Sequence, residues 1–232
     1  MKSTLSAFVL SALALALLAA WPAAAQDVQQ KLEAAKAAAA RNQQTLRSYS
    51  WLEKTELFLK GELKSTKVEA CQYGLDGKVQ KAPVVEPPPP EQKRGLRGKV
   101  VAKKTGEMKA ELESAAALAQ QYVPPDSGMM QVVVNAGTAS IAQAGPEALK
   151  LTFPGYVKAG DALSLTFEKA IKTLRQIDVT TWLDDPTNTV ALKVTMLALP
   201  DGTSYPGQIT LSISKSNIEV RITKTNYQKL AR

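Results

Sequence analysis

The strongest indication of the fold is the stretch LPDGTSYPGQITLSISKSNIEVRITKTNYQKL, Leu199–Leu230. Two apolar series alternate with polar residues in it: Ile209, Leu211, Ile213, and then Ile218, Val220, Ile222. An alternation with a period of two is typical of a β-strand with one buried face. Pro200-Asp201-Gly202 before the first series and Lys215-Ser216-Asn217 between the two have the composition of turns. The stretch therefore predicts consecutive antiparallel strands, apolar on one face and polar on the other.

The same alternation recurs upstream. Its apolar positions are Leu149, Leu151, Phe153, then Leu163, Leu165, Phe167, then Ile177, Val179, Leu183, and then Leu192, Val194, Met196. Near the amino end, residues 49–59 alternate as well, with Gly61 as the expected turn into a strand over about 63–73. Asp76-Gly77 predicts a hairpin turn into 78–85. We expect one curved antiparallel sheet of roughly eight to eleven strands.

Helices are predicted in two regions. The Ala-rich residues 28–48 favour a helix with a shallow apolar face, and residues 107–122 carry an apolar stripe at helical spacing. Pro124-Pro125 ends that second helix, and Asp126 or Ser127 can cap a further one that reaches into residues 129–142. A sheet with one apolar face needs a cover, so the fold class is α+β with helices on one face of the sheet.

The amino end predicts a cleavable signal peptide over residues 1–25. Lys2 is followed by the uncharged run Leu5–Trp21 and then by the small residues Ala23-Ala24-Ala25. The alternative is a membrane anchor, but the run is shorter than the roughly 20 apolar residues that a span needs. We expect cleavage after Ala25, a periplasmic or secreted location, and one domain over residues 26–232.

Composition narrows the functional classes. The chain has no His and one Cys, Cys71, so the commonest general base is missing and an internal disulfide is excluded. No GxSxG motif is present, so we expect a protein that is not an enzyme and uses no metal or cofactor. Asp184-Asp185, with Asp178, fits a turn better than a calcium site. The net charge of +8 favours anionic partners, and export argues against nucleic acid.

Residues 86–105 interrupt the strand pattern. Pro87–Pro90 is a polyproline run, and six basic residues follow it: Lys93, Arg94, Arg97, Lys99, Lys103 and Lys104. We expect an exposed loop. It either contacts anionic headgroups or an acidic envelope protein, or is only a solvated loop.

Five large apolar side chains are candidates for lining a cavity under the helices, with ordinary core packing as the alternative reading: Trp51, Leu57, Leu59, Trp182 and Met196. The helical surfaces above them are rich in small residues and Met, which leaves room for an apolar ligand.

The order of elements resembles the LolA-like carrier fold of the bacterial envelope. That resemblance implies an incomplete β-barrel closed by helices around a hydrophobic cavity for acyl chains. The DGTSY turn, the end of the last strand at Thr225-Asn226-Tyr227 and the segment YVPPD at Tyr122–Asp126 also resemble exported bacterial proteins of unknown function. No functional residue is carried over. The leading hypothesis is non-catalytic binding of an apolar or lipid-like ligand, and the alternative is an envelope interaction or scaffold module that uses the Pro-rich basic loop.

Overall fold

The computed structural model describes residues 40–84, 96–170 and 173–230. The chain divides into two compact units, Met1–Leu46 and Arg47–Arg232. Residues 40–46, the described part of the first unit, are helical, as their Ala-rich surroundings predict. The expected signal peptide over 1–25 and residues 28–39 of the expected first helix lie outside the described residues.

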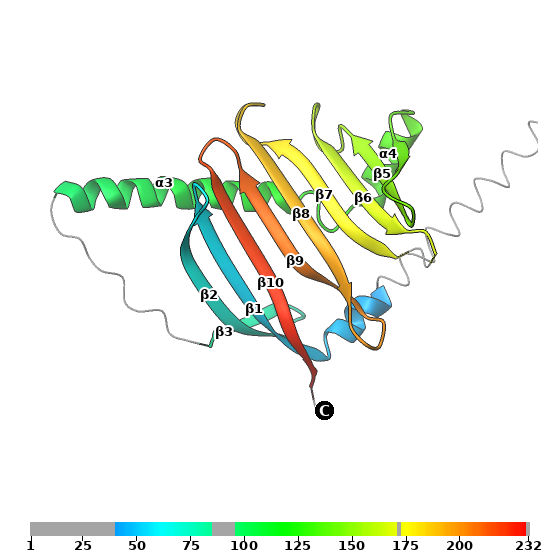
Figure 1. The fold of residues 1–232 in the computed structure, drawn as a ribbon, viewed down its shortest axis with the longest axis horizontal. Coiled ribbons are helices and arrows are strands. Elements are labelled where there is room, and N and C mark those ends of the chain that lie inside the picture. Colours follow the sequence, from blue (N-terminus) through cyan, green and yellow to red (C-terminus); the bar gives the residue numbers. More distant parts are fainter. Residues whose placement is uncertain (1–39, 85–95, 171–172, 231–232) are drawn as a thin grey trace, which may run out of the picture. The chain divides into compact units, whose positions relative to one another are not determined.

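In the second unit, the described residues form a ten-stranded antiparallel sheet (Figure 1). The strands are β1 (Tyr49–Leu59), β2 (Glu62–Tyr73), β3 (Val79–Pro83), β4 (Ser140–Gln143), β5 (Ala148–Pro154), β6 (Ala162–Glu168), β7 (Leu174–Trp182), β8 (Thr189–Ala198), β9 (Ser204–Ile213) and β10 (Ile218–Lys229). Their order is β3-β2-β1-β10-β9-β8-β7-β6-β5-β4, so β3 and β4 are edges and the sheet is not closed. The predicted α+β class, with a curved sheet that forms an incomplete barrel, is confirmed.

One strand pairing joins distant parts of the sequence. Strands β4 to β10 follow one another as a meander, whereas β1 pairs with β10, with Leu57 opposite Val220. The amino-terminal hairpin therefore extends the carboxy-terminal meander. The alternation in the sequence predicts both groups of strands but not this pairing, because a period of two says which face is buried and not which strand lies alongside.

The predicted turns are present. Lys60 and Gly61 connect β1 to β2 with φ values of 54° and 80°, the pair of positive angles that a two-residue hairpin turn requires. Gly77 has a φ of 75°, and the Asp76 carboxylate accepts a hydrogen bond of 3.0 Å from the backbone N–H of Lys78. Asp185, within the expected turn, likewise accepts from the backbone N–H of Thr187 at 2.8 Å.

Helix α3 (Leu96–Ala119) begins eleven residues before the predicted start at 107, so the predicted loop over 86–105 is wrong from Leu96 onward. Gly95, Gly98 and the dense basic charge favour a loop, but the other residues from Leu96 onward are mostly strong helix formers. Two exposed pairs, Lys103–Glu107 at 3.9 Å and Lys109–Glu113 at 3.8 Å, add weak support at helical spacing. Figure 1 shows the amino-terminal part of α3 projecting beyond the strands.

Helix α4 (Ser127–Asn135) is capped as predicted. The Asp126 carboxylate accepts a hydrogen bond of 2.9 Å from the backbone N–H of Met129. The helix is shorter than expected because Gly137, with a φ of 71°, stops it and β4 follows. The prediction of helix as far as residue 142 is therefore wrong.

Two apolar clusters place α3 and α4 on one face of the sheet. In the first cluster, Tyr122 and Val133 lie with inward-facing residues of the strands β5 to β8, among them Phe153, Leu163 and Val179. The second cluster is centred on the fully buried Ala115 of α3. It contains Val190, Ile213 and Ile218, with Leu57 and Leu112 packed against it. No helix among the described residues is long and apolar enough to span a membrane.

Candidate functional site

The five predicted cavity residues lie in separate places. Leu57 and Leu59 both pack against the second cluster, whereas Met196 packs against the first. Trp51 and Trp182 belong to neither cluster. The structure thus brings together two of the five residues. Apolar side chains of the first cluster fill the space over the strands β5 to β8.

Trp51 is part of an aromatic cluster at the other end of β1. Its ring stacks on Tyr227 with a centroid distance of 5.5 Å and tilts against Tyr73 at 5.4 Å. The ring centroid of Tyr205 lies 4.3 Å from that of Tyr227. Because Trp51 is only 4% exposed, its surroundings are those of a packed core residue.

Trp182 faces away from the apolar clusters, because it follows the inward-facing Thr181. The ammonium group of Lys158 lies 4.1 Å from the centre of its ring and also donates a hydrogen bond to the Trp182 carbonyl. This cation–π contact occupies one side of the ring.

A groove lies between α3 and the ends of β1 and β10. We call it the α3 groove. It has a volume of about 540 Å³ and is lined by Leu59, Lys60, Lys104, Thr105, Glu107, Met108, Glu111, Ser216 and Ile218. Its volume is within the range of about 300–1,000 Å³ typical of small-molecule sites. The α3 groove contains one predicted cavity residue, Leu59, and one predicted basic residue, Lys104.

Both apolar and charged side chains line the α3 groove. Met108 is on the half-buried stripe of α3, and Ile218 at the start of β10 is 2% exposed. Lys60, from the β1–β2 turn, and Lys104, from α3, are exposed. An apolar floor with polar groups at its rim is the arrangement that binds amphiphilic molecules.

Of the remaining basic candidates, the structure describes the side chain of Lys103 alone. Arg97 and Lys99 belong to α3, and Lys103 is exposed and 3.9 Å from Glu107. Lys93 and Arg94 lie outside the described residues. Between Lys103 and Lys104, the two whose side chains are described, Lys104 lines the α3 groove.

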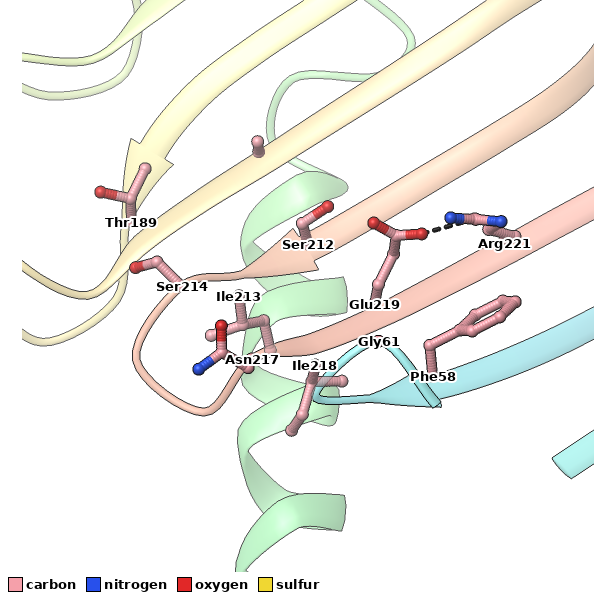
Figure 2. Close-up of a pocket in the computed structure, with 11 residues that line it drawn as sticks. Phe58, Gly61, Thr189, Ser212, Ile213, Ser214, Asn217, Ile218, Glu219 and Arg221 are labelled. Atoms are coloured by element: carbon pink, nitrogen blue, oxygen red, sulfur yellow. Dashed lines mark hydrogen bonds and ion pairs between the residues drawn. The ribbon is translucent and has the colours of Figure 1, made fainter. Parts of the chain in front are cut away.

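A second hollow of about 290 Å³ opens on the other face of the sheet (Figure 2). Figure 2 shows Thr189, Ser212, Glu219 and Arg221 on the side of the strands away from the helix. Glu219 and Arg221 form an ion pair of 2.5 Å, and the Arg221 guanidinium lies 4.3 Å from the centre of the Phe58 ring. The charged groups of this second hollow thus pair with each other, and the lining of the hollow is more polar than that of the α3 groove.

The structure also reveals a buried charge cluster that sequence reasoning missed. Glu53 is 3% exposed, pairs with Lys81 of β3, and has its second carboxylate oxygen 3.9 Å from Lys224 of β10. Burial lowers the pKa of Lys224 below its usual value, although Glu53 opposes this shift. Glu53 is the charged member of the otherwise largely apolar inward series of residues 49–59, and that position is the signal that could have identified it.

Comparison of the chain with protein-family models, with curated proteins and with solved structures finds no match.

Proposed function

We propose that the protein binds an apolar or lipid-like ligand without catalysis and that the α3 groove is the site. The observation that supports this most directly is the meeting of Leu59, Met108 and Ile218 at the floor of a groove of about 540 Å³. Burial of an acyl chain there is favoured by about 0.8 kcal/mol for each CH₂ group removed from water.

The architecture is compatible with this role. An open antiparallel sheet with helices on one face is the general form of the LolA-like carriers. Side chains fill the region over β5 to β8, so a ligand would occupy the α3 groove rather than a cavity that extends under the whole sheet.

The proposed location is the periplasm or the exterior. It rests on the signal peptide expected over residues 1–25 of the sequence. Expression in a bacterium, followed by mass measurement of the exported protein, tests this proposal. A mature chain that begins at Gln26 is the expected result, and a protein that retains residues 1–25 would contradict it.

Lipid extraction from the purified protein tests the binding function. We expect a stoichiometric amphiphile in the extract, or saturable binding of a hydrophobic dye by the lipid-free protein. Met108→Gln in the α3 groove should weaken this binding. The matched control is Val132→Gln on α4, which should leave binding unchanged because Val132 is 69% exposed and away from the groove. A protein that releases no lipid and binds no dye would rule out the proposal.

A second candidate function is protein interaction through α3. The observation in its favour is that the amino-terminal part of this helix projects beyond the strands (Figure 1). Lys103 and Lys104 in this helix are exposed. An acidic envelope protein would be the partner. Replacing both lysines with Gln should abolish a pull-down and leave the circular dichroism spectrum unchanged, and an unchanged set of partners would contradict this function.

A further inference from the structure

The charged residues of the α3 groove differ in whether they are already paired. Glu107 is 3.9 Å from Lys103, and Oε1 of Glu111 accepts a hydrogen bond of 3.4 Å from the side chain of Asn188. Lys60 and Lys104 have no carboxylate partner within the part of the chain that the structure describes. The Asn188 amide is uncharged, so the Glu111 carboxylate offsets one of these two ammonium groups, and one positive charge at the rim remains unmatched.

An uncharged donor adds to this positive rim. Ser216, in the turn between β9 and β10, lines the groove, and its Oγ is buried with no hydrogen-bond partner among the described residues. A buried hydroxyl without a partner costs free energy, which a bound acceptor would recover. The Ser216 hydroxyl and the two ammonium groups are all donors that suit an anionic oxygen.

From these groups we infer that the ligand of the α3 groove is a single-chain amphiphile with an anionic head group, a carboxylate or a phosphate. The chain lies on Leu59, Met108 and Ile218, and the head group lies at Lys60, Lys104 and Ser216. The inference rests on the proposed function, since it assigns a ligand class to the same groove. A groove of about 540 Å³ has room for one small molecule of this kind.

Calorimetric titration with three amphiphiles of the same chain length tests the inference: dodecyl phosphate, dodecylphosphocholine and dodecyltrimethylammonium, each below its micelle concentration. We expect dodecyl phosphate to bind tightest. Lys104→Gln should weaken its binding about fivefold, and Lys60→Gln with Lys104→Gln about 25-fold, because each surface charge contributes on the order of a factor of five. Ser216→Ala should weaken it by a further factor of about five.

Lys109→Gln is the matched control, because Lys109 is on the same helix but pairs with Glu113 and does not line the groove. It should leave all three affinities unchanged. Equal binding of the three amphiphiles, with no effect of Lys60 or Lys104, would overturn the inference and leave lipid binding intact. Binding of none of them would overturn the proposed function as well. Inorganic phosphate that binds as tightly as dodecyl phosphate would show a free-anion site and also overturn the inference.

Discussion

Tyr122, just past the end of α3, donates a hydrogen bond from its hydroxyl to the Asp161 carboxylate, with 2.5 Å between the two oxygens. The Thr181 hydroxyl is 2.9 Å from the same oxygen of Tyr122. Tyr122 is fully buried and Asp161 is 2% exposed, and the same carboxylate oxygen accepts from the backbone N–H of Lys158 at 2.8 Å. The pair thus joins the end of α3 to β7 and to the loop between β5 and β6.

Replacing Tyr122 with Phe should destabilise the protein by about 1–3 kcal/mol, because it leaves the buried Asp161 carboxylate without its hydroxyl donor. Urea unfolding followed by circular dichroism measures this change. Tyr73→Phe is the control, since Tyr73 is half-buried and its ring packs against Trp51. Equal stabilities of the two variants would show that the Tyr122–Asp161 bond does not anchor α3.

Some parts of this structure follow from sequence and others do not. Alternation predicted β1 with its bounds, because Tyr49, Trp51 and Leu57 must share one face of an extended strand. The Asp126 cap could also be predicted, because a carboxylate just before a helix accepts a hydrogen bond from a backbone N–H of the first turn. The start of α3 was not, because the helix passes through Gly98 and Gly106, whose cost is about 1 kcal/mol each.

The α3 groove was predicted only in part. Leu59 was a candidate from its inward position on β1, and Lys104 from the basic run. Their approach depends on where α3 crosses the sheet, and a local pattern contains no such information. Ser216 gave no signal, because a serine in a turn looks the same whether its hydroxyl is solvated or buried.

The buried cluster around Glu53 gives a second stability prediction. Glu53→Gln should cost about 2–3 kcal/mol, less than for a fully buried pair because the side chain of Lys81 is 42% exposed. The loss should be smaller in a Lys224→Met background, where one of the two cations has already been removed. Glu62→Gln, in an exposed pair with Lys64, is the control and should change stability by less than about 0.5 kcal/mol. Additive effects of Glu53 and Lys224 would contradict the coupling.

Asp201 and Tyr49 predict an acid-dependent contribution to stability. The Tyr49 hydroxyl donates a hydrogen bond of 2.6 Å to Asp201, and this bond, with those from Thr203, lowers the pKa of Asp201 to about 2. Between pH 4 and pH 2 the unfolded state therefore binds more protons than the folded state, and stability falls as the pH falls. Tyr49→Phe should reduce stability at pH 7 and flatten this acid limb in unfolding measurements across the range. Parallel pH profiles for the two proteins would contradict the assignment.

Ala115 tests how closely α3 lies on the sheet. Its side chain is fully buried against Val190, Ile213 and Ile218. Ala115→Leu should overpack this contact and cost about 1–3 kcal/mol in thermal or urea unfolding. Ala117→Leu, on the exposed side of the same helix, should have almost no effect. If Ala115→Leu were as stable as Ala117→Leu, α3 would not be packed on the strands as described.

A fluorescence titration of lipid-free protein with a polarity-sensitive fatty-acid probe measures directly whether the α3 groove binds an apolar ligand. We expect saturable binding of one probe per chain, weakened about tenfold by Met108→Gln through the loss of apolar contact, and unchanged by Val132→Gln. Absence of saturable binding in protein that circular dichroism shows to be folded, or equal binding by the two variants, would contradict a ligand site in the α3 groove.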